Sequence, residues 1–160
     1  MELNAFIGNA KTAIDEKGRS SFPREFRRLL SEEEGSSLIL AFGSRDSLIL
    51  FTLEEYSKYI AKIESRPQTS KNVRFNRMFK ANSHYVSLDG QNRILLSKND
   101  IAYAKLDGEV LYVARSGKSV ELWNPSIYNE KFGFNTEEDF NEFDAGFFDD
   151  EPSGDVDENR

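Results

Sequence analysis

Two short segments of the chain each place an aspartate four residues before an arginine, with turn-forming residues between them. The first runs from Asp15 to Arg19 within "AIDEKGRSSFP", and the second runs from Asp89 to Arg93 within "SLDGQNRILLS". A carboxylate at this spacing can hold the guanidinium of the arginine in a bidentate ion pair. A guanidinium fixed on a protruding turn is suited to contact phosphate groups or the edge of guanine. The pattern therefore indicates a nucleic-acid contact that is made twice.

Ordinary turn chemistry explains part of the same pattern. An aspartate at the head of a turn accepts backbone N–H bonds, and Gly18, Gly90 or Asn92 can supply a left-handed backbone. A generic hairpin is therefore an alternative interpretation, but it gives the two arginines no role. Lys17 adds a cation for phosphate in the first turn, whereas Gln91 at the matching position can only hydrogen-bond.

The two turns belong to a longer internal repeat. Asp15 matches Asp89 at an offset of 74 residues, and "SLILFTLEEY" (47–56) matches "SVELWNPSIY" (119–128) at an offset of 72. The order of turn, helix start, strand, turn and strand is the same in both halves, which indicates a tandem duplication. Neither half can bury its apolar faces alone, so we expect hairpins of the two halves to interdigitate in a closed barrel.

Local patterns predict the elements that position these turns. In chain order the sequence predicts strands at 9–14 and 19–22, a helix opened by Pro23 over 23–30, strands at 37–42 and 47–52, and a helix at 53–64. It then predicts a linker helix at 73–81 and two strands within 108–123. The segment "SEEEG" is expected to be a solvated helix end and loop. The stripe formed by Leu48, Leu50 and Phe51, together with Trp123, is expected in the core.

Caps and helix faces give further expectations. Thr52 with Glu55 predicts a capping box at the start of the 53–64 helix, and Ser97 with Asp100 predicts a weaker one. In the basic linker, the spacing predicts that Val73, Met78 and Phe79 point inward.

Composition and charge narrow the class of protein. The chain has 160 residues and no cysteine, so disulfides and thiolate metal sites are excluded. Its longest apolar runs are too short to cross a bilayer, and its start does not resemble a secretory signal. We therefore expect a cytoplasmic protein without a membrane partner.

The net charge of −7 is unevenly distributed along the chain. Residues 133–160 hold eleven acids and one base, which leaves 20 bases and 17 acids in residues 1–132. The body is thus mildly basic and compatible with a nucleic-acid partner, whereas the tail is strongly acidic. Its acidic and aromatic composition predicts a disordered segment, either a solvating extension or one that folds on a partner.

These segments together resemble the MraZ family of bacterial transcriptional regulators, which is built from two SpoVT/AbrB-like swapped-hairpin repeats. The resemblance rests on "AFIGNA", "DEKGRSSFPREFR", "NRMFKANSHYVSLDGQNRILLS" and "VELWNPSIYNE" and covers about residues 5–130. It implies an α+β, mainly β, swapped-hairpin barrel with short helices. The implied organisation is a first repeat at 5–64, a helical linker at 65–80, a second repeat at 81–132 and an acidic disordered tail at 133–160.

The resemblance also implies a function. The family binds double-stranded DNA at promoter repeats of the division and cell-wall gene cluster, as a ring of subunits, here expected to be octamer-like and nucleoid-associated. The DNA-binding residues of the family fall on Asp15, Lys17, Gly18, Arg19, Asp89 and Arg93. The chain departs from the family pattern at Asn92, where glycine is usual, and at Ser97, where proline is usual. Asparagine tolerates left-handed backbone and serine caps helices, so both departures are compatible with the fold.

Two other functions compete with DNA binding. Catalysis is not expected, because there is no cysteine nucleophile or glycine-rich phosphate loop, and the single histidine, His84, suits a structural role better. Asp15 and Asp89 could meet as paired carboxylates, but each has an arginine that would keep it ionised. No cofactor or metal is expected. The alternative function is that of an AbrB-type antitoxin or a protein-interaction module whose acidic-aromatic tail binds a partner.

Overall fold

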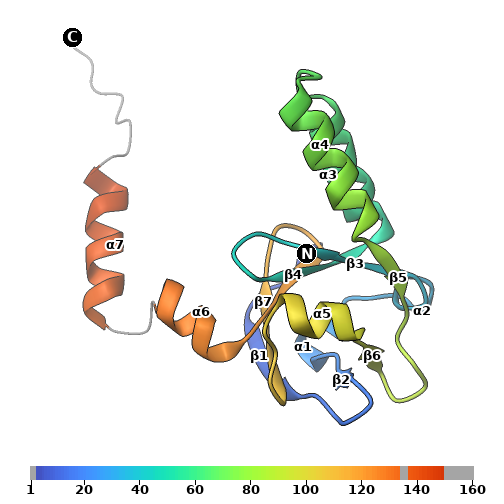
Figure 1. Ribbon diagram of the computed structural model, residues 1–160. Helices are drawn as coiled ribbons and strands as arrows, with labels where there is room; N and C mark the ends of the chain where they lie inside the picture. Colours follow the sequence, from blue (N-terminus) through green and yellow to red (C-terminus); the bar gives the residue numbers. More distant parts are fainter. Residues whose placement is uncertain (1–2, 134–136, 150–160) are drawn as a thin grey trace. The chain divides into compact units, whose positions relative to one another are not determined.

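The computed structural model describes residues 3–133 and 137–149 (Figure 1). The chain divides into two units, Met1–Pro125 and Ser126–Arg160. The first unit contains all the strands that the structure describes and both aspartate–arginine turns.

Two antiparallel sheets form the centre of the first unit. The larger sheet contains, in spatial order, β1 (Asn9–Ala13), β7 (Glu109–Ala114), β8 (Ser119–Trp123), β4 (Leu48–Thr52), β3 (Leu38–Phe42) and β5 (His84–Val86). The smaller sheet pairs β2 (Arg19–Ser21) with β6 (Arg93–Leu95). The strands lie where the alternation and apolar runs of the sequence predict them.

The two strands that flank each aspartate–arginine loop pair with strands of the other half of the chain. β1 pairs with β7 and β2 pairs with β6, and an isolated bridge joins Ile14, just after β1, to Ser20 of β2. In the same way β5 pairs with β3 while β6 pairs with β2. The α+β, mainly β, swapped-hairpin fold is confirmed.

Contacts in the first part of the chain have counterparts 72 to 74 residues later. At the centre of the large sheet, Leu48 lies opposite Leu122 and Leu50 lies opposite Val120. The turn before β4 is closed by Gly43 N–H donating to Ser47 O at 2.7 Å, and the turn before β8 by Arg115 N–H donating to Ser119 O at 3.0 Å. A rotation that exchanges the halves of the chain would thus nearly superimpose the sheet on itself.

The core draws on both halves of the chain. Its largest fully buried side chains include Phe22, Phe26, Leu38, Leu40, Leu48, Leu50, Ile94, Val110, Tyr112 and Leu122. Inside this cluster the Tyr112 hydroxyl lies 2.8 Å from Ser20 Oγ, which satisfies a polar group that is otherwise surrounded by apolar atoms. The prediction that Leu48, Leu50, Phe51 and Trp123 are core residues is confirmed.

The apolar runs of β3 and β4 are continuous because both faces of these strands are covered. One face packs into the barrel core, and the other packs against a helical arm, which we define as α3 (Leu53–Glu64) and α4 (Ser70–Ala81). Figure 1 shows α3 and α4 side by side, leading away from the large sheet. Phe79 is buried at the base of this arm against Phe51 and Tyr59.

The predicted inward face of the linker helix is only partly correct. Phe79 is buried, but Val73 is 37% exposed and Met78 is 54% exposed. Met78 immediately precedes Phe79 and therefore lies about 100° away from it around the helix. The arm is a pair of helices in which only one narrow face of α4 meets α3, so the two flanking apolar positions are left at the surface.

The helix caps differ from the expectation in strength. The Ser97–Asp100 box is complete, with Asp100 N–H donating to Ser97 Oγ at 3.0 Å and Ser97 N–H donating to Asp100 Oδ2 at 2.8 Å. The Thr52 cap is half of a box, because Thr52 Oγ1 accepts from Glu55 N–H at 3.3 Å while Thr52 N–H donates to Lys118 O. The pairing of the sheet takes the donor that a complete box at Thr52 would use.

Three short helices complete the first unit: α1 (Arg24–Arg27), α2 (Glu32–Gly35) and α5 (Lys98–Tyr103). The predicted 23–30 helix is thus a single turn, which buries Phe26 and leaves Leu29 and Leu30 on the edge of the core. The "SEEEG" segment is the helix α2 itself, opened by a complete box between Ser31 and Glu34.

The second unit contains α6 (Pro125–Phe132) and α7 (Glu137–Asp149). The expectation of a disordered tail therefore differs from the structure over α7, while residues 134–136 and 150–160 lie outside the described residues. Three acids in the first turn of α7 favour a helix there, because they face the positive end of the helix dipole. Across the described parts of both units, every helix is too short or too polar to cross a membrane.

Candidate nucleic-acid interface

The first loop, Asp15–Arg19, is organised by the Asp15 carboxylate. Its Oδ1 accepts the backbone N–H groups of Lys17 and Arg19, both at 2.9 Å, and its Oδ2 accepts Arg19 Nε–H at 2.7 Å. The backbone closes the same turn, with Gly18 N–H donating to Asp15 O at 3.0 Å. One side chain thus shapes the loop and also orients the guanidinium.

The second loop, Asp89–Arg93, repeats this arrangement bond for bond. Asp89 Oδ1 accepts the backbone N–H groups of Gln91 at 2.8 Å and of Arg93 at 2.9 Å, and Oδ2 accepts Arg93 Nε–H at 2.9 Å. The backbone bond from Asn92 N–H to Asp89 O matches the one made by Gly18. The structure therefore places the predicted aspartate and arginine of each loop in direct contact.

The two loops are joined to each other at their bases. Phe22 N–H donates to Asn92 O at 2.9 Å, and Leu96 N–H donates to Gly18 O at 2.8 Å. Between these bonds, β2 and β6 pair with Arg19 opposite Leu95 and Ser21 opposite Arg93. The two arginines therefore lie on one small rigid sheet. Figure 1 shows both loops at the end of the first unit where this sheet lies.

Each loop needs one residue with left-handed backbone. Gly18 has φ of +87°, and a Cβ at this position would lie 2.7 Å from Leu96 O, so both the backbone and the space favour glycine. Asn92 has φ of +59° at the matching position of the second loop. Asparagine adopts this conformation more readily than other non-glycine residues. The loop therefore keeps its shape although Asn92 stands where glycine is usual.

The electrostatics keep both carboxylates ionised. The backbone N–H of Arg19 is the largest cause that lowers the pKa of Asp15 below its ordinary value, and Arg93 does the same for the pKa of Asp89. A carboxylate held ionised in this way does not share a proton with a second one. The arrangement argues against a pair of catalytic carboxylates and favours two oriented arginines.

The guanidinium groups retain donors for a ligand. Each arginine uses Nε toward its aspartate, and within residues 3–133 and 137–149 neither pair of Nη nitrogens makes a hydrogen bond. The side chains are partly exposed, 32% for Arg19 and 26% for Arg93. Lys17 beside Arg19 is exposed and adds a positive charge, whereas Gln91 beside Arg93 adds none. Chemically, the loops offer two forked donors suited to phosphate oxygens or to O6 and N7 of guanine.

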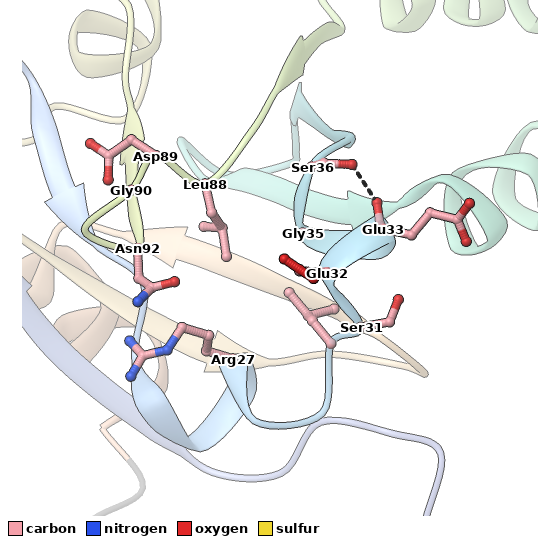
Figure 2. Close-up of a pocket in the computed structure, with 11 residues that line it drawn as sticks. Arg27, Ser31, Glu32, Glu33, Gly35, Ser36, Leu88, Asp89, Gly90 and Asn92 are labelled. Carbon is pink, nitrogen blue, oxygen red and sulfur yellow. Dashed lines mark hydrogen bonds between the residues drawn. The ribbon is translucent and has the colours of Figure 1, made fainter.

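A groove of about 690 Å³ adjoins the second loop. Asp89, Gly90 and Asn92 line one side of it, and α1, α2 and the turn between them line the other (Figure 2). Arg27 of α1 lies across from Asn92 in Figure 2 and donates from Nη1 to Phe22 O at 3.3 Å. Sequence reasoning did not assign Arg27 to this site. The cluster of arginines that follows the first loop was the one feature of the sequence that could have indicated it.

His84 has a structural partner. Its Nε2 lies 3.0 Å from Oδ2 and 3.2 Å from Oδ1 of the buried Asp100, the residue that closes the capping box of α5. This contact agrees with the structural role expected for the histidine. Among the described residues, no group of three or more histidine, cysteine, aspartate or glutamate side chains is arranged to hold a metal ion.

The swapped-hairpin barrel with an aspartate–arginine loop from each half defines the SpoVT/AbrB-like class of protein. Residues 5–79 match the family described as "MraZ protein, putative antitoxin-like". Curated relatives extend the similarity through the second half of the chain. The chain belongs to the MraZ family.

Three relatives show how far this similarity reaches. The transcriptional regulator MraZ of Thermoanaerobacter sp. (strain X514) is 34% identical over 137 residues, which are 85% of this chain and 92% of that protein. The protein of the same name from Mycoplasmoides gallisepticum is 35% identical over 146 residues, 91% of this chain and 99% of that protein. The one from Acetivibrio thermocellus is 37% identical over 129 residues, 80% and 87% of the two chains.

Proposed function

We propose that this protein is a sequence-specific DNA-binding transcriptional regulator that contacts DNA through its two aspartate–arginine loops. The observation that carries the proposal is the repeated geometry of Asp15–Arg19 and Asp89–Arg93 on one small sheet, with the Nη donors of both arginines left for a ligand. The relatives named as transcriptional regulators support the same function. Catalysis is not part of the proposal.

In this proposal each residue of the predicted site has a role. Arg19 and Arg93 contact base edges or phosphates, and Asp15 and Asp89 orient them. Lys17 adds a phosphate contact. Gly18 lets the first loop pack closely against Leu96, the residue directly after β6. Residues 5–64 and 81–132 act as two repeats joined by the helical linker.

The proposed target is repeated DNA, bound by an oligomer. One barrel offers few phosphate contacts, so useful affinity requires several loops to bind neighbouring sites together. We therefore propose a cytoplasmic, nucleoid-associated ring, octamer-like in size, on promoter repeats of the division and cell-wall gene cluster. Light scattering of the purified protein tests the subunit number, and a monomer at micromolar concentration contradicts the ring.

Fluorescence anisotropy with two DNA duplexes tests the function. One duplex carries the region upstream of the protein's own gene, and the other is a shuffled sequence of equal length and composition. The proposal predicts that the upstream duplex is bound at least about a thousandfold more tightly at physiological salt. It also predicts that the Arg19→Ala/Arg93→Ala double variant loses this preference. Equal affinities of the wild type for both duplexes contradict sequence-specific binding.

An antitoxin or protein-interaction role is the second candidate, because the matching family description includes the words "antitoxin-like". In that case the acidic tail, and not the loops, carries the function. Deleting residues 133–160 then abolishes capture of a protein partner, while the Arg19→Ala/Arg93→Ala variant captures it normally.

A further inference from the structure

The helical arm carries an outer face that combines apolar and basic side chains. Phe75 and Met78 of α4 are 46% and 54% exposed, and because they are three residues apart they lie on one side of the helix. Neighbouring large apolar side chains at a helix surface mark a site of interaction. The arm therefore has the character of a docking surface.

The charge of α4 sets a second requirement for a partner that binds this face. The helix contains four bases and no acid. Lys80 is paired with Glu64 at 2.7 Å, but Lys71, Arg74 and Arg77 form no ion pair within the described part of the chain. Lys71 precedes Phe75 by four residues and Arg74 precedes Met78 by four residues, so these two cations lie on the same side of α4 as the apolar pair. An occupant of this face needs apolar groups for Phe75 and Met78 and carboxylates for Lys71 and Arg74.

DNA satisfies only half of this requirement. Its phosphates would pair with the cations, but they offer nothing for the apolar side chains, whose burial is worth about 25 cal/mol for each Å². An acidic helix with apolar residues satisfies both halves, as in helix-in-groove recognition.

The chain itself contains a helix of this kind. α7 has 13 residues with six acids and no base, and the exposed side chain of Phe140 lies among them. Its length of about 20 Å matches the length of about 18 Å of the 12-residue α4. Glu137 lies three residues before Phe140 and Asp144 lies four residues after it, so both acids share the side of α7 that Phe140 occupies.

We propose that α7 of one copy of this chain docks on the outer face of α4 in a second copy. Such a contact is heterologous, because each copy gives its tail to one neighbour and receives a tail from another. Heterologous contacts close into rings when the rotation between subunits allows it. The docking therefore deepens the proposed ring assembly by naming surfaces that join the subunits, and it is independent of whether the loops bind DNA.

Disulfide cross-linking tests the proposal directly, because the chain has no cysteine of its own. Met78→Cys in one copy and Phe140→Cys in a second, differently tagged copy are mixed as full-length proteins under mild oxidant. We expect the mixed pair to cross-link at least about tenfold faster than a control pair in which Lys62→Cys on α3 replaces Met78→Cys. Equal rates for the two pairs contradict the docking. The double variant Met78→Cys/Phe140→Cys, when dilute, should not close within one chain, and a fast intrachain bond would also contradict it.

Charge reversal gives a second and independent test. Lys71→Glu/Arg74→Glu should slow the cross-link about tenfold, and adding Glu137→Arg/Asp144→Arg to the other copy should restore it, because two lost ion pairs are re-formed with opposite sign. A reversal on α4 that leaves the cross-link unchanged but weakens binding to random DNA overturns the proposal in favour of a DNA contact. Failure of the upstream duplex to bind while the cross-link forms would affect only the proposed function.

Discussion

The first and second loops of this protein share the same hydrogen bonds but not the same residues between aspartate and arginine. In both, the carboxylate accepts two backbone N–H groups and the arginine Nε–H within 2.7 to 2.9 Å. Lys17 and Gly18 in the first loop are replaced by Gln91 and Asn92 in the second. The comparison shows that the aspartate–arginine pair sets the same loop with either glycine or asparagine in the left-handed position, whereas the residues between them adjust charge and packing.

The surroundings of the loops also differ. Gly18 lies so close to Leu96 O that no Cβ fits, while the second loop borders the groove that Arg27 lines. We interpret the first loop as the tighter and more positively charged of two otherwise equivalent DNA contacts.

The largest expected effect comes from removing the arginines. Arg19→Ala should lower affinity for the upstream duplex by about 5- to 150-fold, since a bidentate base contact is worth about 1–3 kcal/mol. Arg93→Ala should act in the same direction, with equal or smaller size. Anisotropy titrations measure both, and Arg66→Ala, in the exposed connection between α3 and α4, is the matched control. If both loop variants bind as the wild type does, with unchanged circular dichroism, the assignment of the loops is wrong.

Exchanging the residue with left-handed backbone should change the free energy of unfolding more in the first loop than in the second. Gly18→Asn introduces a Cβ against Leu96 O and should lower the free energy of unfolding by about 1–3 kcal/mol. The reverse exchange, Asn92→Gly, should change it by less than about 1 kcal/mol. Urea denaturation gives both values. Equal losses at the two positions would show that the loops are packed alike.

Acid should weaken both loops together. The folded-state pKa of Asp15 and that of Asp89 lie below the ordinary value of 3.8, chiefly because backbone N–H groups of Arg19 and Arg93 bond the ionised form. The stabilisation is complete above the unfolded-state pKa and is lost as the pH falls through the lowered folded-state pKa. The wild type should therefore exceed Asp15→Asn in melting temperature at pH 7, and this excess should shrink toward pH 3. A constant excess between pH 7 and pH 3 contradicts the expectation.

The smallest expected effect concerns salt. Lys17→Gln removes one phosphate contact and should reduce the slope of log affinity against log salt by about 0.9, whereas Gln91→Lys should increase it by a similar amount. Titrations over a range of salt concentrations measure the slopes. Unchanged slopes in both variants would mean that position 17 and its counterpart do not face phosphate.

The sequence predicted the strands, the loops and their arginines because these depend on local spacing. The offset of 74 residues between Asp15 and Asp89 was enough to expect equal loops, and the structure shows equal bonds. Contacts between segments that are distant in the sequence could not be predicted from local spacing. Examples are the bond from Phe22 N–H to Asn92 O and the position of Arg27 beside the second loop.

The errors of the sequence reasoning have the same origin. The capping box at Thr52 was expected to be the stronger one, but the sheet uses its N–H for Lys118 O. Met78 was expected inside because it is apolar, yet the arm offers only one narrow buried face. A composition that favours disorder did not reveal α7, where acids at the helix start and regularly spaced apolar residues favour a helix.

Site-directed photocross-linking to DNA tests the central claim most directly. Lys17→Cys, Gln91→Cys and, on the arm, Lys62→Cys are each labelled with a photoactivatable group and mixed with the upstream duplex. If both loops face DNA, positions 17 and 91 cross-link to it and position 62 does not. Cross-links from position 62 with none from either loop would contradict the account.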